Sequence, residues 1–237
     1  MRRMLLALTL VAGCEGETIS AATHGRNLLA DTDLSDGSAN VFACSDCHET
    51  TPGGAEGRIM PGYSLVDSAH RESFWGGYER TLLDAMSFCR VWFMGGVRFE
   101  EEDEDARAIL EYVLSVSQTD PAPMLALTVT LDIVPIELGD PAEGEAVYDG
   151  ACRHCHGSPG GSPPERFRGT TEPIPDDEAG WGALYDENFP DTPYSLIVIE
   201  KIRHGRFFLV GGTMPLFSHE AMTDEEVGAL IAFLFPD

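Results

Sequence analysis

The pentapeptides Cys44-Ser45-Asp46-Cys47-His48 and Cys152-Arg153-His154-Cys155-His156 decide how this chain folds. Each is a Cys-x-x-Cys-His motif, whose two thiols can bond a haem through thioether links and whose histidine is placed to ligate the iron. A redox disulfide or half of a zinc site would leave the histidine unexplained, and a zinc ribbon brings its cysteine pairs roughly 15 to 20 residues apart. We therefore expect two covalently bound haem c groups, one in each half of the chain.

The composition is typical of an acidic protein with two small domains. The chain has 237 residues and a formal net charge of −25. A domain of about 100 residues has limited apolar area to bury, so a porphyrin would form much of its core. The charge excludes a nucleic-acid-binding protein, because phosphate binding needs clustered Lys and Arg. It favours other redox proteins as partners, in particular basic electron donors or acceptors.

The N-terminus has the features of an export signal. Met1-Arg2-Arg3 precedes the apolar run 4–12, which is too short to span a bilayer. Residues 10–14 resemble a bacterial lipobox, which implies that Cys14 becomes the lipid-modified mature N-terminus and holds the protein at a membrane. We expect a signal peptide over 1–13, a tether over 14–23 and a position on the periplasmic side. Glu15 favours the outer membrane.

The periodicity of apolar residues predicts an all-α fold of two tandem domains, 24–116 and 140–237. Apolar residues recur at helical spacing in 81–89, 106–116 and 196–202. Residues 117–139 are expected to be a linker, and the alternation in 127–136 predicts one or two short extended β segments within it. The Gly- and Pro-rich stretch 157–180 is expected to be a loop.

Capping signals define two helices of the second domain. Asp140 is placed as an N-cap with Pro141 in the first helical turn. Thr223 and Glu226 form a capping box at the start of the last helix. Gly144 would let these two helices cross at close range.

The order of helix, Cys-x-x-Cys-His, loop, helix, Met-Pro and helix over 140–237 resembles the class I cytochrome c fold. In the first half the helix pattern is similar, but no Met-Pro dipeptide stands at the usual place. The two-domain arrangement is also similar to the thiosulfate dehydrogenase and sulfur-oxidation dihaem cytochrome families. The resemblance implies two cytochrome c-like domains in a dihaem c-type cytochrome.

His48 and His156 are the expected proximal iron ligands, and Met214 is the expected distal ligand of the second haem. Met214 lies in Gly-Gly-Thr-Met-Pro and matches the Met-Pro position, and a thioether ligand raises the reduction potential. His204 is the competing ligand, expected instead to pack or to cap near a propionate. His154, inside the motif, is expected to face solvent.

The distal ligand of the first haem is either Met94 or Cys89, two soft sulfur donors that spacing does not separate. Met60-Pro61 follows His48 too closely for the chain to have turned round the haem. In the families that the chain resembles, a cysteine at a similar distance ligates the iron, which would make Cys89 a candidate catalytic ligand. Arg90, beside it, could hold an anion.

Three functions follow from these residues. The first is an exported electron carrier, and the second is a thiosulfate dehydrogenase-like oxidoreductase with catalysis at the first haem. The third is a haem subunit of a larger membrane oxidoreductase. The enzyme hypothesis gains from a set of arginines that either binds an anion or pairs with carboxylates, namely Arg58, Arg71, Arg80, Arg90 and Arg98.

Overall fold

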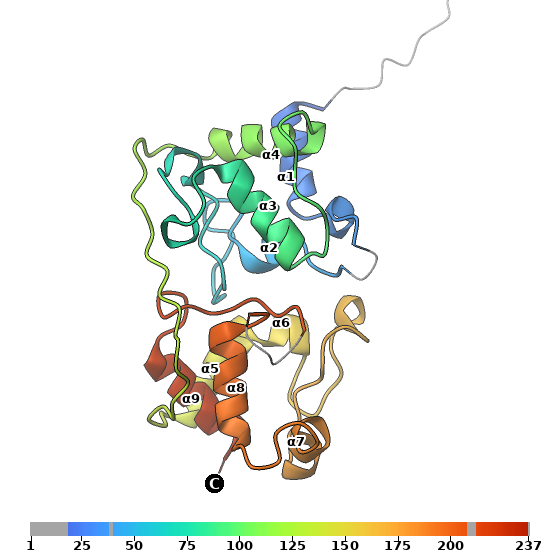
Figure 1. Ribbon diagram of the computed structural model, residues 1–237, viewed down its shortest axis with the longest axis vertical. Coiled ribbons are helices and arrows are strands. Elements are labelled where there is room, and N and C mark those ends of the chain that lie inside the picture. The colour runs from blue at the N-terminus through green and yellow to red at the C-terminus, as the bar shows by residue number, and fades with distance from the viewer. Residues whose placement is uncertain (1–18, 38–39, 208–211, 237) are drawn as a thin grey trace, which may run out of the picture.

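The protein is all-α, as predicted, and its helices form two lobes (Figure 1). The computed structural model describes residues 19–37, 40–207 and 212–236. The first lobe contains α1 (Ala21–Leu28), α2 (Cys44–Cys47), α3 (Leu82–Trp92) and α4 (Glu104–Ser115). The second contains α5 (Pro141–Ala151), α6 (Arg153–His156), α7 (Glu178–Tyr185), α8 (Tyr194–His204) and α9 (Asp224–Leu234). Short 3₁₀ turns cover Thr32–Leu34, Ser68–His70, Trp75–Gly77 and Glu165–Phe167.

The caps predicted for the second lobe are present. The Asp140 carboxylate accepts a hydrogen bond from the Ala142 N–H at 2.8 Å, and Pro141 is the first residue of α5. At the start of α9 the Glu226 N–H donates to the Thr223 hydroxyl at 3.2 Å, and the Thr223 N–H donates to the Glu226 carboxylate at 2.7 Å. These local bonds satisfy N–H groups that a helix start leaves free.

Each lobe is built on a helix pair that crosses at a glycine. A Cβ on Gly25 of α1 would lie 1.9 Å from the carbonyl oxygen of Ala108 on α4. A Cβ on Gly144 of α5 would lie 2.0 Å from the carbonyl oxygen of Ala229 on α9. The predicted close crossing at Gly144 is therefore confirmed, and the first lobe repeats it at Gly25.

Two helices lie where the sequence analysis expected none. Helix α1 begins inside the segment 14–23 that was expected to be a tether, with Ser20 as its N-cap. Helix α7 begins at Glu178, inside the stretch 157–180 expected to be a loop, with Asp177 as its N-cap. Both helices have eight residues, which leaves too few apolar positions for a clear periodic pattern.

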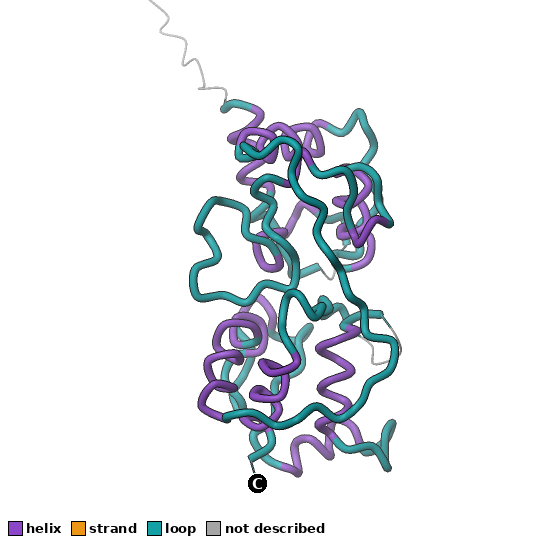
Figure 2. The backbone as a smooth tube through the Cα atoms, turned by 90° about the vertical axis from the view of Figure 1, so that its left-hand side faces the viewer, coloured by secondary structure: helices purple, strands orange, loops and turns teal. Residues whose placement is uncertain are grey.

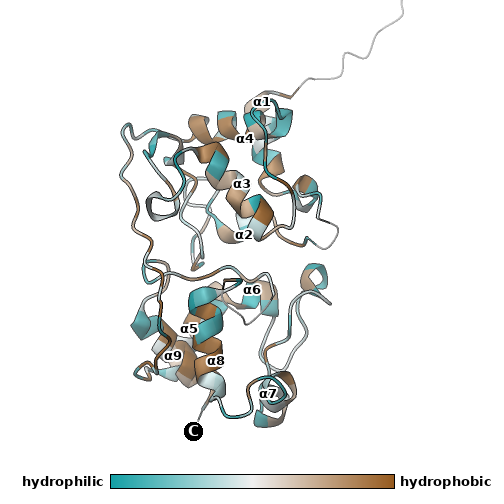
Figure 3. Cartoon of the chain, in the orientation of Figure 1, coloured by the Kyte–Doolittle hydropathy of each residue, from teal (hydrophilic) through white to brown (hydrophobic). Residues whose placement is uncertain are grey.

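Each lobe has its own apolar core, and each core takes a side chain from the other half of the chain. Phe167 is 1 % exposed and packs in the core of the first lobe, with its ring 5.9 Å from that of Phe42. Ile59 packs against the core of the second lobe, where apolar residues gather on α8 and α9 (Figure 3). The lobes are thus joined through their cores.

Residues 117–139 form no strand, and only Ala122 makes an isolated bridge, to Arg71. Figure 2 shows the long loops between the helices, with no described segment coloured as a strand. The expected β segments over 127–136 are therefore absent, since this stretch makes no β-bridge. Side chains hold the linker instead. The Asp67 carboxylate, for example, accepts hydrogen bonds from the N–H groups of Gln118 and Thr119 and from the Thr119 hydroxyl.

Further side chains of the second lobe bind Thr128 and Thr130 of the linker. The Thr128 N–H and hydroxyl donate to the Glu220 carboxylate at 3.0 and 2.5 Å. Burial acts to raise the pKa of Glu220, but hydrogen bonds led by those from Thr128 outweigh it and lower the pKa to about 2. His204 bonds the Thr130 carbonyl at 2.6 Å, and His219 bonds the Thr130 hydroxyl at 2.7 Å.

The predicted signal peptide 1–13 and the predicted lipidation site Cys14 lie outside the described residues. Within 19–37, 40–207 and 212–236, no helix combines the length and the apolar character that crossing a bilayer requires.

Candidate haem sites

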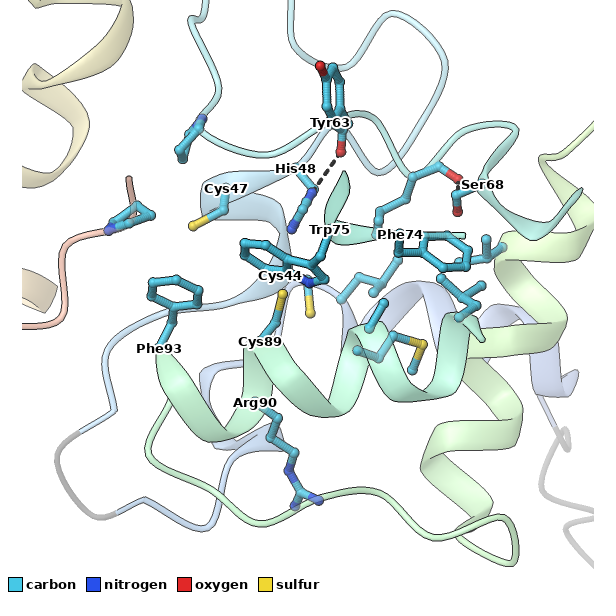
Figure 4. Close-up of a pocket in the computed structure, with 18 of the residues that line it drawn as sticks. Cys44, Cys47, His48, Tyr63, Ser68, Phe74, Trp75, Cys89, Arg90 and Phe93 are labelled. Carbon is cyan, nitrogen blue, oxygen red and sulfur yellow. Dashed lines mark hydrogen bonds between the residues drawn. The ribbon is translucent and has the colours of Figure 1, made fainter. Parts of the chain in front are cut away.

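The first pentapeptide opens onto an apolar cavity in the first lobe (Figure 4). Cys44 and Cys47 are the first and last residues of α2, and His48 follows it. All three line the cavity, so two thiols and an imidazole meet at one wall. The rest of the wall is largely apolar and includes Leu29, Leu34, Phe42, Leu65, Phe74, Ile109 and Val113.

The His48 ring is oriented for a ligand on its far nitrogen. Its Nδ1 lies 2.7 Å from the Tyr63 carbonyl oxygen (Figure 4). Because a carbonyl can only accept, Nδ1 carries the proton and Nε2 keeps its lone pair, the form that binds iron. Burial lowers the pKa of His48, which also favours the neutral ring. A Cβ on Gly62 would lie 2.2 Å from Cε1 of this ring, so glycine is needed beside it.

The thiols that face this cavity are neutral in the protein without a metal. Burial raises the pKa of Cys44 to about 11 and that of Cys47 well above its usual value. Burial also raises the pKa of Cys89 to about 12. A thiolate at Cys89 would therefore need a cation such as iron beside it.

Both candidate distal ligands of the first haem line the cavity, so the choice stays open at this level. Cys89 lies in the last turn of α3 and faces the wall that holds Cys44 and His48 (Figure 4). Met94 follows the helix, is 6 % exposed and lies in the core of the first lobe. Its carbonyl accepts a hydrogen bond of 2.5 Å from the Ser35 hydroxyl.

A buried arginine provides a further test of whether haem fits. Arg71 lines the cavity, and its Nε is buried with no hydrogen-bond partner among the described residues. Its other nitrogens donate to the carbonyls of Ser64 and Val66 at 3.3 and 3.4 Å. Burial lowers the pKa of Arg71, so a carboxylate brought into the cavity would stabilise the cation. Haem carries two such carboxylates, and the donor set therefore fits it.

The five arginines considered for anion binding do not converge on the cavity. Arg90 lies beside Cys89, but its guanidinium extends away to Asp36 at 3.0 Å (Figure 4). Arg98 pairs with Asp84 at 2.7 Å, and Arg80 is exposed. Arg58 lies in a different cleft, whereas Arg71 and Arg90 both line the cavity and both have a buried Nε without a hydrogen-bond partner among the described residues. Because Arg90 already pairs with Asp36, Arg71 is the better placed of the two for an anion in the cavity.

The second pentapeptide repeats the histidine arrangement of the first. His156 ends α6, and its Nδ1 lies 2.9 Å from the carbonyl oxygen of Glu172, 16 residues later. In the first lobe the corresponding separation from His48 to Tyr63 is 15 residues. Burial lowers the pKa of His156. Each motif therefore presents a neutral Nε2.

Met214 and His204 occupy different surroundings. Met214 packs against the core of the second lobe. His204 is buried, with Nδ1 2.7 Å from the Glu200 carboxylate and Nε2 2.6 Å from the Thr130 carbonyl oxygen. Because both of its ring nitrogens are engaged, His204 is not placed to ligate iron in this arrangement.

The middle residues of the two pentapeptides meet between the lobes. His154 Nε2 lies 2.8 Å from the carboxylate of Asp46, whose side chain is 5 % exposed. Arg166 also pairs with Asp46, and Arg58 donates to the carbonyls of Ser45 and Asp46 at 3.3 and 3.0 Å. His154, expected to face solvent, is partly covered by this contact. Met60 lines the same cleft rather than the apolar cavity.

Hydrogen bonds decide the charge state of Asp46. Burial acts to raise the pKa of this carboxyl, but the bonds from His154, the Ala43 N–H and Arg166 outweigh it and lower the pKa. Asp46 is therefore a stable anion that links the two motifs.

Residues from outside the first domain complete the first cavity, and sequence reasoning missed them. Leu125 and Leu127 come from the linker, and Pro215 and Leu216 follow Met214 in the second lobe. For Leu127 the available signal was the apolar alternation in 127–136, which was interpreted as short extended β segments. Gly62 was missed as well, since its role depends on the ring of His48.

Comparisons with known proteins agree with this chemistry. Residues 139–234 match the family model described as cytochrome c oxidase, cbb3-type, subunit III. The thiosulfate dehydrogenase of Allochromatium vinosum is 29 % identical over 163 residues, which is 65 % of this chain and 58 % of that protein. The chain thus spans little more than half the length of this relative.

A solved structure, the as-isolated thiosulfate dehydrogenase from Marichromatium purpuratum, aligns with 90 % of this chain and 45 % of its own, at 16 % identity and a TM-score of 0.44. The family match and the Allochromatium relative support a c-type cytochrome related to the thiosulfate dehydrogenases. A cytochrome c domain carries covalently bound haem c.

Proposed function

We propose that the protein is an exported, lipid-anchored dihaem c-type cytochrome that carries electrons between redox partners. The observation that supports the proposal most directly is that both halves of the chain share one arrangement around the proximal histidine. Each Cys-x-x-Cys-His motif is followed, 15 or 16 residues later, by a backbone carbonyl that accepts the proximal histidine's Nδ1 proton. Each also lies in a lobe whose helices cross at a glycine.

The chain's own residues have defined roles toward the cofactors. Haem c supplies a reversible one-electron couple when bound. Cys44, Cys47, Cys152 and Cys155 would hold two haems, and His48 and His156 would ligate the irons through Nε2. The apolar wall of the first cavity would keep water from a haem bound there, and Arg71 would be placed to bind a carboxylate of that haem. Met214 would complete the second iron's coordination with a thioether, which raises the potential.

The haem count is the direct test. Protein purified from a host with a c-type maturation system should have a mass that includes two haems, and a Soret band should persist after denaturation because the thioether bonds are covalent. A mass with one haem or none would contradict the dihaem proposal.

For the first haem we propose Cys89 as the distal ligand. It lies in the last turn of α3 and faces the cavity wall that holds Cys44 and His48. Cys89→Ser should change the low-temperature EPR signal of one haem and leave the other unchanged. Met94→Leu, the matched control, should leave both signals unchanged. The reverse result would assign the position to Met94.

Membrane attachment and partner choice are parts of the same proposal. Cys14 would carry the lipid, so Cys14→Ser should move the protein from the membrane to the soluble fraction. The net charge of −25 should attract basic partners. Electron transfer to a basic cytochrome should therefore slow as ionic strength rises, and a rate independent of salt would count against such a partner.

A second candidate is a thiosulfate dehydrogenase-like oxidoreductase, favoured by the Allochromatium relative and by Cys89 in the cavity. Two thiosulfate ions would form one sulfur–sulfur bond, give tetrathionate and release two electrons, one to each haem. Arg71 is the arginine of the cavity that could bind the thiosulfate anion. The test is tetrathionate formation from thiosulfate. Loss of this activity in Cys89→Ser, together with its retention in Met94→Leu, would favour this function. If the dihaem protein does not oxidise thiosulfate, the oxidoreductase function is wrong and the electron-carrier function remains.

A further inference from the structure

The segment Met214–Phe217 lies between the core of the second lobe and the cavity of the first lobe, and it contributes side chains to both. Met214 and Phe217 pack in the core of the second lobe. Pro215 and Leu216, between them in sequence, line the cavity of the first lobe together with Leu125. Leu216 is 6 % exposed, so its side chain is enclosed there. Neighbouring residues of one short segment thus pack in the second core and line the first cavity.

The C-terminal end of α8 holds this segment through its backbone. The Phe217 N–H donates to the Ile202 carbonyl at 2.8 Å. Arg203, which is 2 % exposed, donates to the carbonyls of Phe217, Ser218 and Met222 at 3.2, 3.2 and 2.7 Å. These bonds fix the position of the backbone that follows Met214.

Gly205 determines how closely the segment approaches α8. It ends the helix with a φ of 57°, a conformation that favours glycine. A Cβ at this position would lie 2.5 Å from the Leu216 nitrogen and 2.6 Å from the Met214 carbonyl oxygen. Both contacts are with backbone, so a larger residue must displace the segment as a whole.

We propose that Met214–Phe217 is a common wall of the two haem sites, and that Gly205 and Arg203 are the positioning residues that set it for both. The inference rests on the proposed binding of two haems. Because Met214 and Leu216 are two residues apart, a shift of the segment moves the distal side of the second site and the enclosure of the first together. A residue in one lobe therefore tunes the haem of the other lobe.

The experiment first assigns the EPR signals of the oxidised holoprotein. Gly62→Ala crowds the His48 ring and identifies the signal of the first haem, while Met214→Ala identifies that of the second. Gly205→Ala should then shift both signals and both reduction potentials. Gly169→Ala is the matched control, because Gly169 also has a positive φ, 84°, but a Cβ there meets nothing within 4 Å. It should shift neither signal.

A second pair of variants separates this role from general destabilisation. Leu216→Ala should admit water to the first cavity and shift the first haem's signal while Met214 ligation persists. Leu230→Ala removes a still more deeply buried leucine, 1 % exposed, from the core of the second lobe, away from the first cavity, and should leave the first signal unchanged.

The outcomes distinguish failure of the shared wall from failure of the proposed dihaem function. If mass spectrometry finds fewer than two haems in the unmodified protein, the proposed function fails. If two haems are present and Gly205→Ala changes only the second, the shared wall is wrong. If Gly205→Ala yields no holoprotein, Leu216→Ala decides, and an unchanged first haem overturns the inference.

Discussion

The two proposed haem sites are alike around the Cys-x-x-Cys-His motifs and differ on the side that faces these motifs. Both motifs lie on a short helix, and His48 and His156 are each oriented by a carbonyl from the following loop. Across the first cavity stand Cys89, in the last turn of α3, and Met94, which follows that helix. The ligand proposed for the second site, Met214, lies instead in a loop whose next two residues line the first cavity. Local sequence builds the attachment side, and tertiary packing builds the distal side.

This difference points to different tasks for the two halves. The family match covers residues 139–234 and leaves the first half outside it. The first half also has the cavity lined by cysteine and by a buried arginine with an unpaired Nε. In the proposed oxidoreductase, substrate chemistry would therefore belong to the first site and electron exchange with partners to the second.

The largest effect is expected from removing one attachment motif at a time. Cys44→Ser with Cys47→Ser, and Cys152→Ser with Cys155→Ser, should each remove one haem and about half of the Soret absorbance, because each motif binds one porphyrin. Mass spectrometry of the two proteins checks this. Loss of both haems from either double variant would show that the two sites do not load independently.

A smaller effect is expected from the glycines at the two helix crossings. Gly25→Ala and Gly144→Ala place a methyl group against the facing backbone and should each destabilise the protein by about 1–3 kcal/mol in thermal or chemical unfolding. Gly150→Ala on α5 is the control, since its Cβ would meet no atom closer than 3.4 Å. It should be neutral or stabilising, by up to about 1 kcal/mol. Unequal costs at the two crossings would break the likeness of the lobes.

The contact between the motifs predicts a pH-dependent contribution to stability. Asp46→Asn leaves His154 and Arg166 without their anion and should cost about 1–3 kcal/mol at neutral pH. Because the folded pKa of Asp46 is lowered, its contribution is complete above the ordinary pKa of about 3.9 and is lost as pH falls through the folded value. The stabilities of wild type and Asp46→Asn, followed by acid titration, should therefore converge at low pH.

The smallest effect belongs to the control for that contact. Asp149 lines the same cleft and pairs with Arg153 at 2.5 Å, but both side chains are about half exposed. Asp149→Asn should cost only about 0.3–0.5 kcal/mol, as for other exposed pairs one helical turn apart. A cost equal to that of Asp46→Asn would mean that burial does not distinguish the two carboxylates.

Sequence predicts the features that depend on neighbouring residues. The all-α fold, the caps at Asp140 and Thr223 and the close crossing at Gly144 follow from spacing and from known capping chemistry. The equivalent crossing at Gly25 escaped because α1 is short and polar. The pentapeptides likewise carry their own chemistry, which is why both histidines could be singled out as proximal ligands.

Sequence does not predict contacts between residues far apart in the chain. In the linker, Leu125 and Leu127 line the first cavity and Ile133 and Ile136 pack against the second core, whereas Val129 and Leu131 between them are exposed. Apolar alternation alone does not distinguish these positions. Neither Arg90, which turns to Asp36, nor His154, which meets Asp46, could be placed without the fold. The choice between Cys89 and Met94 is of the same kind, since both side chains reach one cavity.

The exchange of Phe167 and Ile59 between the cores has a consequence for how the protein can be divided. A gene fragment that encodes either half alone would leave a hole where the missing ring or aliphatic group belongs and would expose apolar surface to solvent. Neither half is then an independent folding unit, and calorimetry should record one cooperative melting event for the holoprotein.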